Sequence, residues 1–190
     1  MDVAHQTNAI VVGTGDLSEL ALGWCTYNGD HISMYGINSG IPKTLVRYLV
    51  EFAAGEATET VEGILHDILD TPVSPELLPP SEDGTIAQKT EDTIGPYILH
   101  DFFLYYAIRC MFPPRKIYAF ACAAFEGEFS QATIKSWLAV FYKRFFTQQF
   151  KRSCLPDGVK IGSVALSPRA DWRMPSDAQA GLWIREVEEL

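Results

Sequence analysis

The sequence predicts an α/β fold: the later part of a doubly wound, Rossmann-like parallel sheet, followed by a helix-rich C-terminal part. The first observation is a short apolar run, residues 9–12, that breaks at the glycine turn of residues 13–15 and resumes over residues 16–22. This is the pattern of a buried strand, a glycine turn and the first turns of a helix. The second observation is the helical periodicity of most of the chain after Lys43.

The start of the chain bears on the domain organisation. A buried parallel strand needs neighbouring strands and helices on both faces of the sheet. Only residues 1–8, most of them polar, precede the apolar run. We therefore expect residues 1–190 to be the C-terminal portion of a larger domain.

Polar residues follow the predicted strand directly and are the first candidate ligand-binding groups. Thr14, Asp16, Ser18 and Glu19 lie at the carboxyl end of the strand, where ligands bind to open α/β sheets. The N-terminus of the next helix offers free N–H groups and partial positive charge there. Asp16 and Glu19 also have the spacing of a capping box, which is a purely structural alternative.

Residues that typically start or end helices, together with apolar residues at helical spacing, predict six further helices. They cover residues 42–52, 59–69, 97–111, 115–125, a long stretch that follows Ser130, and residues 178–190. Residues 71–88 and 151–177 are predicted to be loops. Aromatic residues after Ser130 are too dense for one helix face, so we expect some of them to pack against another subunit or an upstream part.

Composition excludes several classes of protein. The net charge of -9 argues against nucleic-acid binding, which requires clustered Lys and Arg. The 4 cysteines are far apart, which is typical of a reducing, cytoplasmic compartment, and the 4 scattered histidines make a structural zinc site improbable. Neither a signal peptide nor a membrane-spanning run is present in the sequence, so we expect no membrane association.

Six long segments, in order, resemble the synthetase domain of bacterial glutamine-dependent NAD+ synthetases. They are GTGDLSELALGW (13–24), IPKTLVRYLV (41–50), SPELLPP (74–80), IAQKTEDTIGPYILHDFFL (86–104), FYKRFFTQQFKRSCLPDG (141–158) and SVALSPRADWRMPSDA (163–178). The resemblance implies the C-terminal portion of an ATP pyrophosphatase-type domain with an adenine-nucleotide alpha-hydrolase-like fold. The family's ATP-gripping loop and glutaminase domain would then lie upstream.

The resemblance implies a ligase that uses ATP and Mg²⁺. In the family, ATP adenylates the nicotinate carboxylate of deamido-NAD+ and pyrophosphate leaves. Ammonia, supplied from glutamine by the glutaminase domain, then displaces AMP. The resemblance further implies a cytoplasmic homo-oligomer, and we expect this chain alone to be inactive.

Seven residues match site positions of the family, and none of them carries an implied catalytic role. Positions that contact ATP match Thr14, Lys43 and Ser74. Positions that contact deamido-NAD+ match Glu19, Trp24, Asp30 and Lys151, and Glu19 also matches a magnesium ligand. The sequence around Lys43 supports its assignment independently, because a cation in the first turn of a helix is disfavoured unless an anion is near.

Alternatives remain open at this point. Taken alone, Trp24 would more often be a core aromatic residue, and Lys151 part of a solvated face. His100 and Asp101 lie in an apolar run and are expected to form a buried, satisfied pair. The chain could also be a non-catalytic dinucleotide-binding or oligomerisation fragment, or a related ATP pyrophosphatase with another acceptor.

Overall fold

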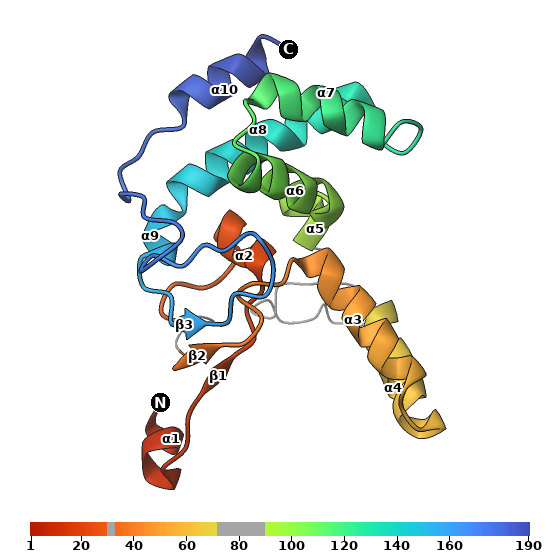
Figure 1. Cartoon of the computed structure of the whole chain (residues 1–190), viewed down its shortest axis with the longest axis vertical. Coiled ribbons are helices and arrows are strands. Elements are labelled where there is room, and N and C mark those ends of the chain that lie inside the picture. The colour runs from red at the N-terminus through yellow and green to blue at the C-terminus, as the bar shows by residue number, and fades with distance from the viewer. Residues whose placement is uncertain (30–32, 72–89) are drawn as a thin grey trace, which may run out of the picture.

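A small parallel sheet lies below a helical C-terminal half, and a pair of helices projects to one side of the sheet (Figure 1). The computed structural model describes residues 1–29, 33–71 and 90–190. Its strands are β1 (Val12–Gly13), β2 (Tyr35–Gly36) and β3 (Asp157–Gly158), in the order β1-β2-β3 and all parallel. The predicted α/β class, with a parallel sheet and a helix-rich C-terminal part, is confirmed.

The N-terminal half contains five helices within the described residues. These are α1 (Asp2–Thr7), α2 (Leu17–Leu22), α3 (Lys43–Gly55), α4 (Glu59–Asp70) and α5 (Thr90–Ile94). The helices predicted over residues 16–22, 42–52 and 59–69 are therefore confirmed. The predicted loop over residues 71–88 lies outside the described residues except at its first position.

The prediction of a buried first strand is wrong for this structure. Strand β1 contains only two residues, and the side chains of Ile10 and Val12 are 66% and 48% exposed. Within the described residues β1 pairs on one side only, with β2, at Val12 opposite Tyr35. Figure 1 shows β1 below the C-terminal helices.

Two of the three strands were not predicted at all. β2 and β3 are each two residues long, and β3 lies in a stretch predicted to be a loop. A strand of two residues is too short to show the alternation of apolar and polar residues by which strands are predicted. Their register depends on close backbone approach instead: a Cβ at Gly158 would lie 2.4 Å from the carbonyl oxygen of Gly36.

The C-terminal half packs around one central helix. Its elements are α6 (Tyr97–Leu104), the π-helix η1 (Tyr105–Arg109), α7 (Pro114–Ala124), α8 (Gln131–Thr147), α9 (Gln149–Arg152) and α10 (Gly181–Glu188). The stretch predicted as one helix over residues 97–111 thus changes to a π-helix after Leu104. Helix α8 contacts α6, α7 and α10.

Most of the aromatic residues after Ser130 are covered by the chain itself, and the expectation that some of them pack against another subunit or an upstream part stays a prediction. Phe141, Tyr142, Phe145 and Phe146 are buried within the chain. Because α8 has neighbours on several sides, more than one of its faces is covered. Phe150 of α9 is the exception, being 43% exposed beside the ring of Tyr27.

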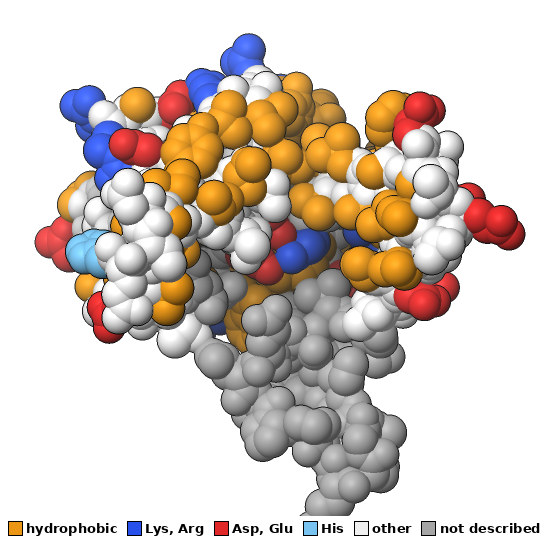
Figure 2. Space-filling view, turned by 90° about the horizontal axis from the view of Figure 1, so that it is seen from below, with side chains coloured by type: hydrophobic (Ala, Val, Ile, Leu, Met, Phe, Trp, Pro, Cys, Tyr) orange, Lys and Arg blue, Asp and Glu red, His pale blue; other side chains and the backbone are white. Residues whose placement is uncertain are grey.

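Helices α3 and α4 form a projecting arm (Figure 1). The apolar side chains of this arm stay largely exposed. Examples are Tyr48 and Phe52 of α3 and Ile64 and Ile68 of α4. Hydrophobic side chains line this arm in the space-filling view (Figure 2).

The expected homo-oligomer stays a prediction. Among the described helices, none is both long and apolar enough to cross a membrane.

His100 makes stability depend on pH. Burial, with a smaller contribution from Arg144, lowers the pKa of His100 to about 4, whereas its ordinary value is 6.5. A lowered pKa means that the folded state binds fewer protons than the unfolded state. The contribution of His100 to the free energy of unfolding is therefore fully present above pH 6.5, and it is lost as the pH falls towards 4.

We therefore expect His100 to reduce the free energy of unfolding by about 2 kcal/mol between pH 7 and pH 5. His100→Gln keeps a donor for the carbonyl oxygen of Ile94, which lies 2.5 Å from His100 Nε2. Urea denaturation of both proteins at the two pH values isolates the effect. Equal pH dependence of the two proteins would contradict the assignment.

Candidate ligand-binding site

The N-terminus of α2 is closed by a reciprocal capping box. Asp16 Oδ1 accepts a hydrogen bond from the Glu19 amide at 2.9 Å, and the Asp16 amide donates to Glu19 Oε2 at 3.1 Å. The structural alternative for these two carboxylates is therefore confirmed. Asp16 is only 2% exposed, so its remaining oxygen also requires a partner.

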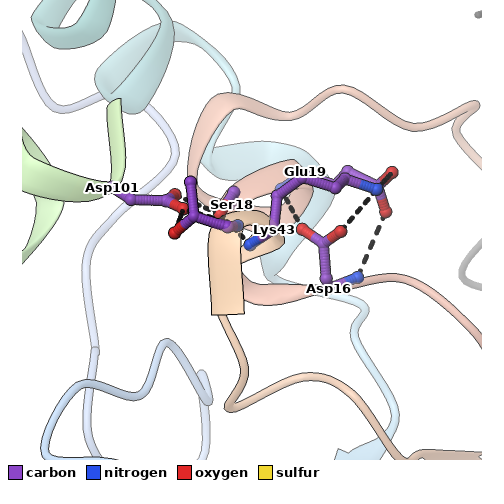
Figure 3. Close-up of polar contacts among 6 residues, drawn as sticks. Asp16, Ser18, Glu19, Lys43 and Asp101 are labelled. Carbon is purple, nitrogen blue, oxygen red and sulfur yellow. Dashed lines mark hydrogen bonds and ion pairs between the residues drawn. The ribbon is translucent and has the colours of Figure 1, made fainter. Parts of the chain in front are cut away.

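Lys43 provides that partner. Its ammonium lies 2.6 Å from Asp16 Oδ2 and 2.7 Å from Glu19 Oε1 (Figure 3). Glu19 thus uses one oxygen for the capping box and the other for the ion pair, so the two roles do not exclude each other. The two carboxylates also offset the unfavourable position of a cation in the first turn of α3. We call Asp16, Glu19 and Lys43 the ion-pair cluster.

Burial governs the charges of this cluster. It raises the pKa of Asp16 and of Glu19, and repulsion between the two carboxylates adds to the rise at Glu19. Burial alone would lower the pKa of Lys43, but attraction to Asp16 and Glu19 outweighs it and the pKa is raised. Lys43 therefore stays positively charged near neutral pH.

A second polar group lies behind the cluster and joins three helices. Asp101 of α6 accepts hydrogen bonds from the Thr44 amide at 3.0 Å, from the Thr44 hydroxyl at 2.7 Å and from the Ser18 hydroxyl. Burial raises the pKa of Asp101, and these hydrogen bonds act against the rise. The predicted His100–Asp101 pair is wrong, because adjacent residues of a helix face different directions: His100 bonds to the carbonyl oxygen of Ile94.

The ion-pair cluster separates two hollows. Glu19 lines a cavity at the carboxyl ends of the strands, together with Gly13, Gly36 and Gly158 among others. Lys43 lines a groove between α3, α4 and α6, together with Tyr97 and others. Acidic and basic side chains meet in a hollow near the centre of the face seen in Figure 2. The location agrees with the rule that ligands bind beyond the carboxyl ends of parallel strands.

The C-terminus of α2 is held by three cations from the C-terminal half. Arg152 donates to the carbonyl oxygens of Leu20 at 3.1 Å and Ala21 at 2.8 Å. Arg144 and Lys151 bond to the next carbonyls, at 2.9 Å each. Cations at the C-terminus of a helix are stabilised by its dipole.

Arg152 is the most buried of these cations, at 1% exposed. Burial lowers the pKa of Arg152 to about 9. Its other acceptors in the described part of the chain are the side-chain oxygen of Gln149 and the carbonyl oxygen of Phe145, which are neutral. The guanidinium therefore joins α2 to the end of α8 through the fork geometry that arginine provides.

The structure brings together some of the predicted site residues but not all. Glu19 and Lys43 are in contact, and Thr14 is exposed between β1 and α2. Trp24 and Lys151 lie at the opposite end of α2. The Trp24 ring is 5.2 Å from the Arg144 guanidinium, and the Lys151 ammonium is 2.6 Å from the carbonyl oxygen of Cys25.

Two predicted residues, Asp30 and Ser74, lie outside the described residues. The sequence did not predict the roles of two further residues. Asp101 was expected to pair with His100, and no role was predicted for Arg152. The signal for Asp101 was its place in a strongly apolar helix, because a buried carboxylate requires hydrogen-bond donors. The sequence around Arg152 carries no corresponding signal.

The donor set of the cluster fits Mg²⁺ better than a transition metal. The described residues contain no group of three or more His, Cys, Asp and Glu side chains that could hold a metal ion. Asp16 and Glu19 supply carboxylate oxygens only. Mg²⁺ is commonly held by one or two carboxylates together with phosphate oxygens of the substrate. A site of this kind is complete only with a phosphate ligand.

Arg152 offers a test of how α2 is held. Arg152→Leu leaves the carbonyl oxygens of Leu20, Ala21 and Phe145 without this donor, so we expect the free energy of unfolding to fall by about 3 kcal/mol. Urea denaturation measures the change, and Lys143→Leu on the exposed side of α8 is the control. Stability equal to the wild type would show that desolvation of the guanidinium cancels its hydrogen bonds.

Comparison with known proteins identifies the family. Residues 1–106 match the family model described as NAD synthase. The glutamine-dependent NAD(+) synthetases of Mycobacterium tuberculosis (strain ATCC 25618 / H37Rv) and Mycobacterium leprae (strain TN) are each 42% identical over 207 residues, covering 98% of this chain and 30% of the relative. The chain therefore spans less than a third of the length of these relatives.

A solved structure has the same fold. The crystal structure of a glutamine-dependent NAD(+) synthetase from Cytophaga hutchinsonii matches with a TM-score of 0.72 and 18% sequence identity, over 98% of this chain and 28% of that one. The family model alone covers more than half of the chain. The chain belongs to the NAD synthase family.

Proposed function

We propose that this chain is part of a glutamine-dependent NAD+ synthetase, which converts deamido-NAD+ to NAD+ with ATP. The observation that carries the proposal is the charged Lys43 held between two carboxylates beyond the carboxyl end of β1. In a member of the NAD synthase family, a lysine and a carboxylate pair at this edge of the sheet suit a nucleotide phosphate and its metal ion.

Lys43 is the group we assign to the phosphates of ATP. Its ammonium keeps its charge, and its side chain lines the groove between α3 and α6. A phosphate oxygen can replace the Glu19 oxygen beside the ammonium, so that the ammonium stays paired, and the released carboxylate then requires another cation. Thr14, exposed beside the cluster, is assigned to ATP as well, and so is Ser74.

Glu19 is the group we assign to Mg²⁺, with Asp16 beside it. When bound there, Mg²⁺ would neutralise charge on the phosphates and on these carboxylates. Release of Glu19 Oε1 from Lys43 would free a carboxylate oxygen for this role, while Oε2 stays in the capping box. The helix can therefore keep its N-terminal cap when its ligands change.

The other end of α2 is assigned to deamido-NAD+. Trp24 presents an aromatic surface and Lys151 a cation, and both lie just beyond Gly23. Asp30 is assigned to deamido-NAD+ as well, and so is Glu19, which lies in the first turn of α2. The Trp24 ring is also stacked with Arg144, so the aromatic wall has a fixed orientation.

The reaction proceeds in two steps. A carboxylate oxygen of deamido-NAD+ attacks the α-phosphorus of ATP, and pyrophosphate leaves. Ammonia then attacks the adenylated carbonyl carbon, and AMP leaves to give the amide. We propose that glutamine supplies the ammonia, that the assembly is a homo-oligomer, and that the 190-residue chain is inactive by itself.

Product analysis tests the function. The complete gene product, given deamido-NAD+, ATP, Mg²⁺ and glutamine or ammonium, should form NAD+, AMP and pyrophosphate in equal amounts. NAD+ formation that does not require ATP would contradict the proposal. Binding of a dinucleotide without turnover would favour the non-catalytic alternative, and ATP turnover with another acceptor would favour the related ATP pyrophosphatase.

Glu19→Gln should reduce kcat of the complete gene product by about a hundredfold, since preorganised charge at a reacting centre commonly contributes this much. Glutamine has the same shape and can still accept the capping hydrogen bond from Asp16. Glu126→Gln, at an exposed position after α7, is the matched control. Turnover near the wild-type value in Glu19→Gln would remove Glu19 from the site.

Lys151→Ala should raise the KM for deamido-NAD+ by about tenfold, because a hydrogen bond to a charged group contributes about 1.5 kcal/mol. Steady-state kinetics at saturating ATP measure the effect, and Lys143→Ala is the control. An unchanged KM would leave Lys151 only its observed role, which is to bond the carbonyl oxygens of Gly23 and Cys25.

A further inference from the structure

The first turn of α3 is held by side chains from two other helices. Ser18 Oγ of α2 accepts a hydrogen bond from the Lys43 amide at 2.8 Å. Asp101 of α6 accepts from the next amide, that of Thr44, and from the Thr44 hydroxyl. The N-cap residue of α3 is Pro42, which makes no side-chain capping bond. The first amides of α3 are therefore capped by side chains of other helices. Asp101 also accepts a hydrogen bond from the Ser18 hydroxyl (Figure 3).

These bonds fix the backbone from which the Lys43 side chain starts. Asp101 binds Ser18 on one side and Thr44 on the other, so it joins α2, which carries Asp16 and Glu19, to α3, which carries Lys43. No hydrogen bond or ion pair between Asp101 and the Lys43 ammonium is present among the described contacts.

We propose that Asp101 is a positioning residue, which holds the start of α3 so that the Lys43 ammonium stands where it can bind the phosphates of ATP. This inference rests on the proposed function of Lys43. Asp101 would act mainly on the affinity for a polyphosphate group, because Trp24 and Lys151, two of the residues assigned to deamido-NAD+, lie at the other end of α2.

The chemistry around Asp101 requires a carboxylate. Ser18 accepts from the Lys43 amide, so its own hydroxyl proton is directed to Asp101. The Thr44 amide and the Thr44 hydroxyl are donors as well. A carboxylate only accepts, whereas an asparagine would turn an N–H₂ group towards one of these donors. Asparagine would also remove the negative charge near the N-terminus of α3.

The test compares two affinities in the complete gene product. Isothermal titration gives the Kd of MgATP without deamido-NAD+, and the Kd of deamido-NAD+ without ATP. Asp101→Asn should raise the Kd of MgATP by about tenfold and leave the Kd of deamido-NAD+ within about twofold of the wild type. Asp67→Asn, exposed on α4, is the matched control and should change neither value.

Substitutions of Thr44 keep the test informative if Asp101→Asn folds poorly. Thr44→Val removes the hydroxyl donor and leaves the amide, so we expect a smaller rise in the Kd of MgATP alone. Thr44→Ser retains a hydroxyl and should restore the wild-type value. Thermal unfolding of each variant separates a loss of folded protein from a loss of affinity.

A double-mutant cycle tests whether Asp101 acts through Lys43. In a Lys43→Ala background, Asp101→Asn should no longer change the Kd of MgATP. The inference is overturned if the effect persists there, if both Kd values rise together, or if Asp101→Asn binds MgATP as the wild type does. A wild-type protein that binds neither ligand would instead contradict the proposed function.

Discussion

The Lys43 ammonium between Asp16 and Glu19 is the interaction on which the arrangement of this molecule depends. It places one positive charge against two carboxylates whose pKa values are raised by burial. The same contact links α3 to α2, together with the bonds from Ser18 and Asp101 that hold the start of α3. Because α3 starts the projecting arm and α2 packs on the C-terminal half, the cluster joins these two parts of the fold, in addition to the contacts between α3 and α6.

Helix α2 is short, and nearly every polar group at its ends is bonded. Its N-terminus has the capping box and Lys43, and its C-terminus has Arg144, Lys151 and Arg152. Gly23 ends the helix with φ of 60°, where a Cβ would lie 2.3 Å from the side chain of Gln148. A helix of six residues has little stability of its own, so its orientation comes from these tertiary partners.

The accuracy with which the sequence predicts each element depends on the number of residues that carry its pattern. Amphipathic helices such as α3 and α4 have several repeats of the apolar pattern, and they were predicted within a few residues. Strands β2 and β3 have two residues each and no pattern. For the site, the spacing of Asp16 and Glu19 and the odd position of Lys43 were visible locally. The links from Asp101 and Arg152 were not, because they join residues far apart in sequence and depend on tertiary packing.

The cations that hold the end of α2 have a consequence for how the chain folds. Arg144 and Arg152 bond to carbonyl oxygens 122 to 132 residues earlier in the sequence. Contacts of such long sequence separation require the intervening chain to be ordered first, and they form slowly. During synthesis, Arg152 emerges only after α8 is complete. We therefore expect the helical C-terminal half to fold first and the ligand-binding edge of the sheet to be completed on top of it.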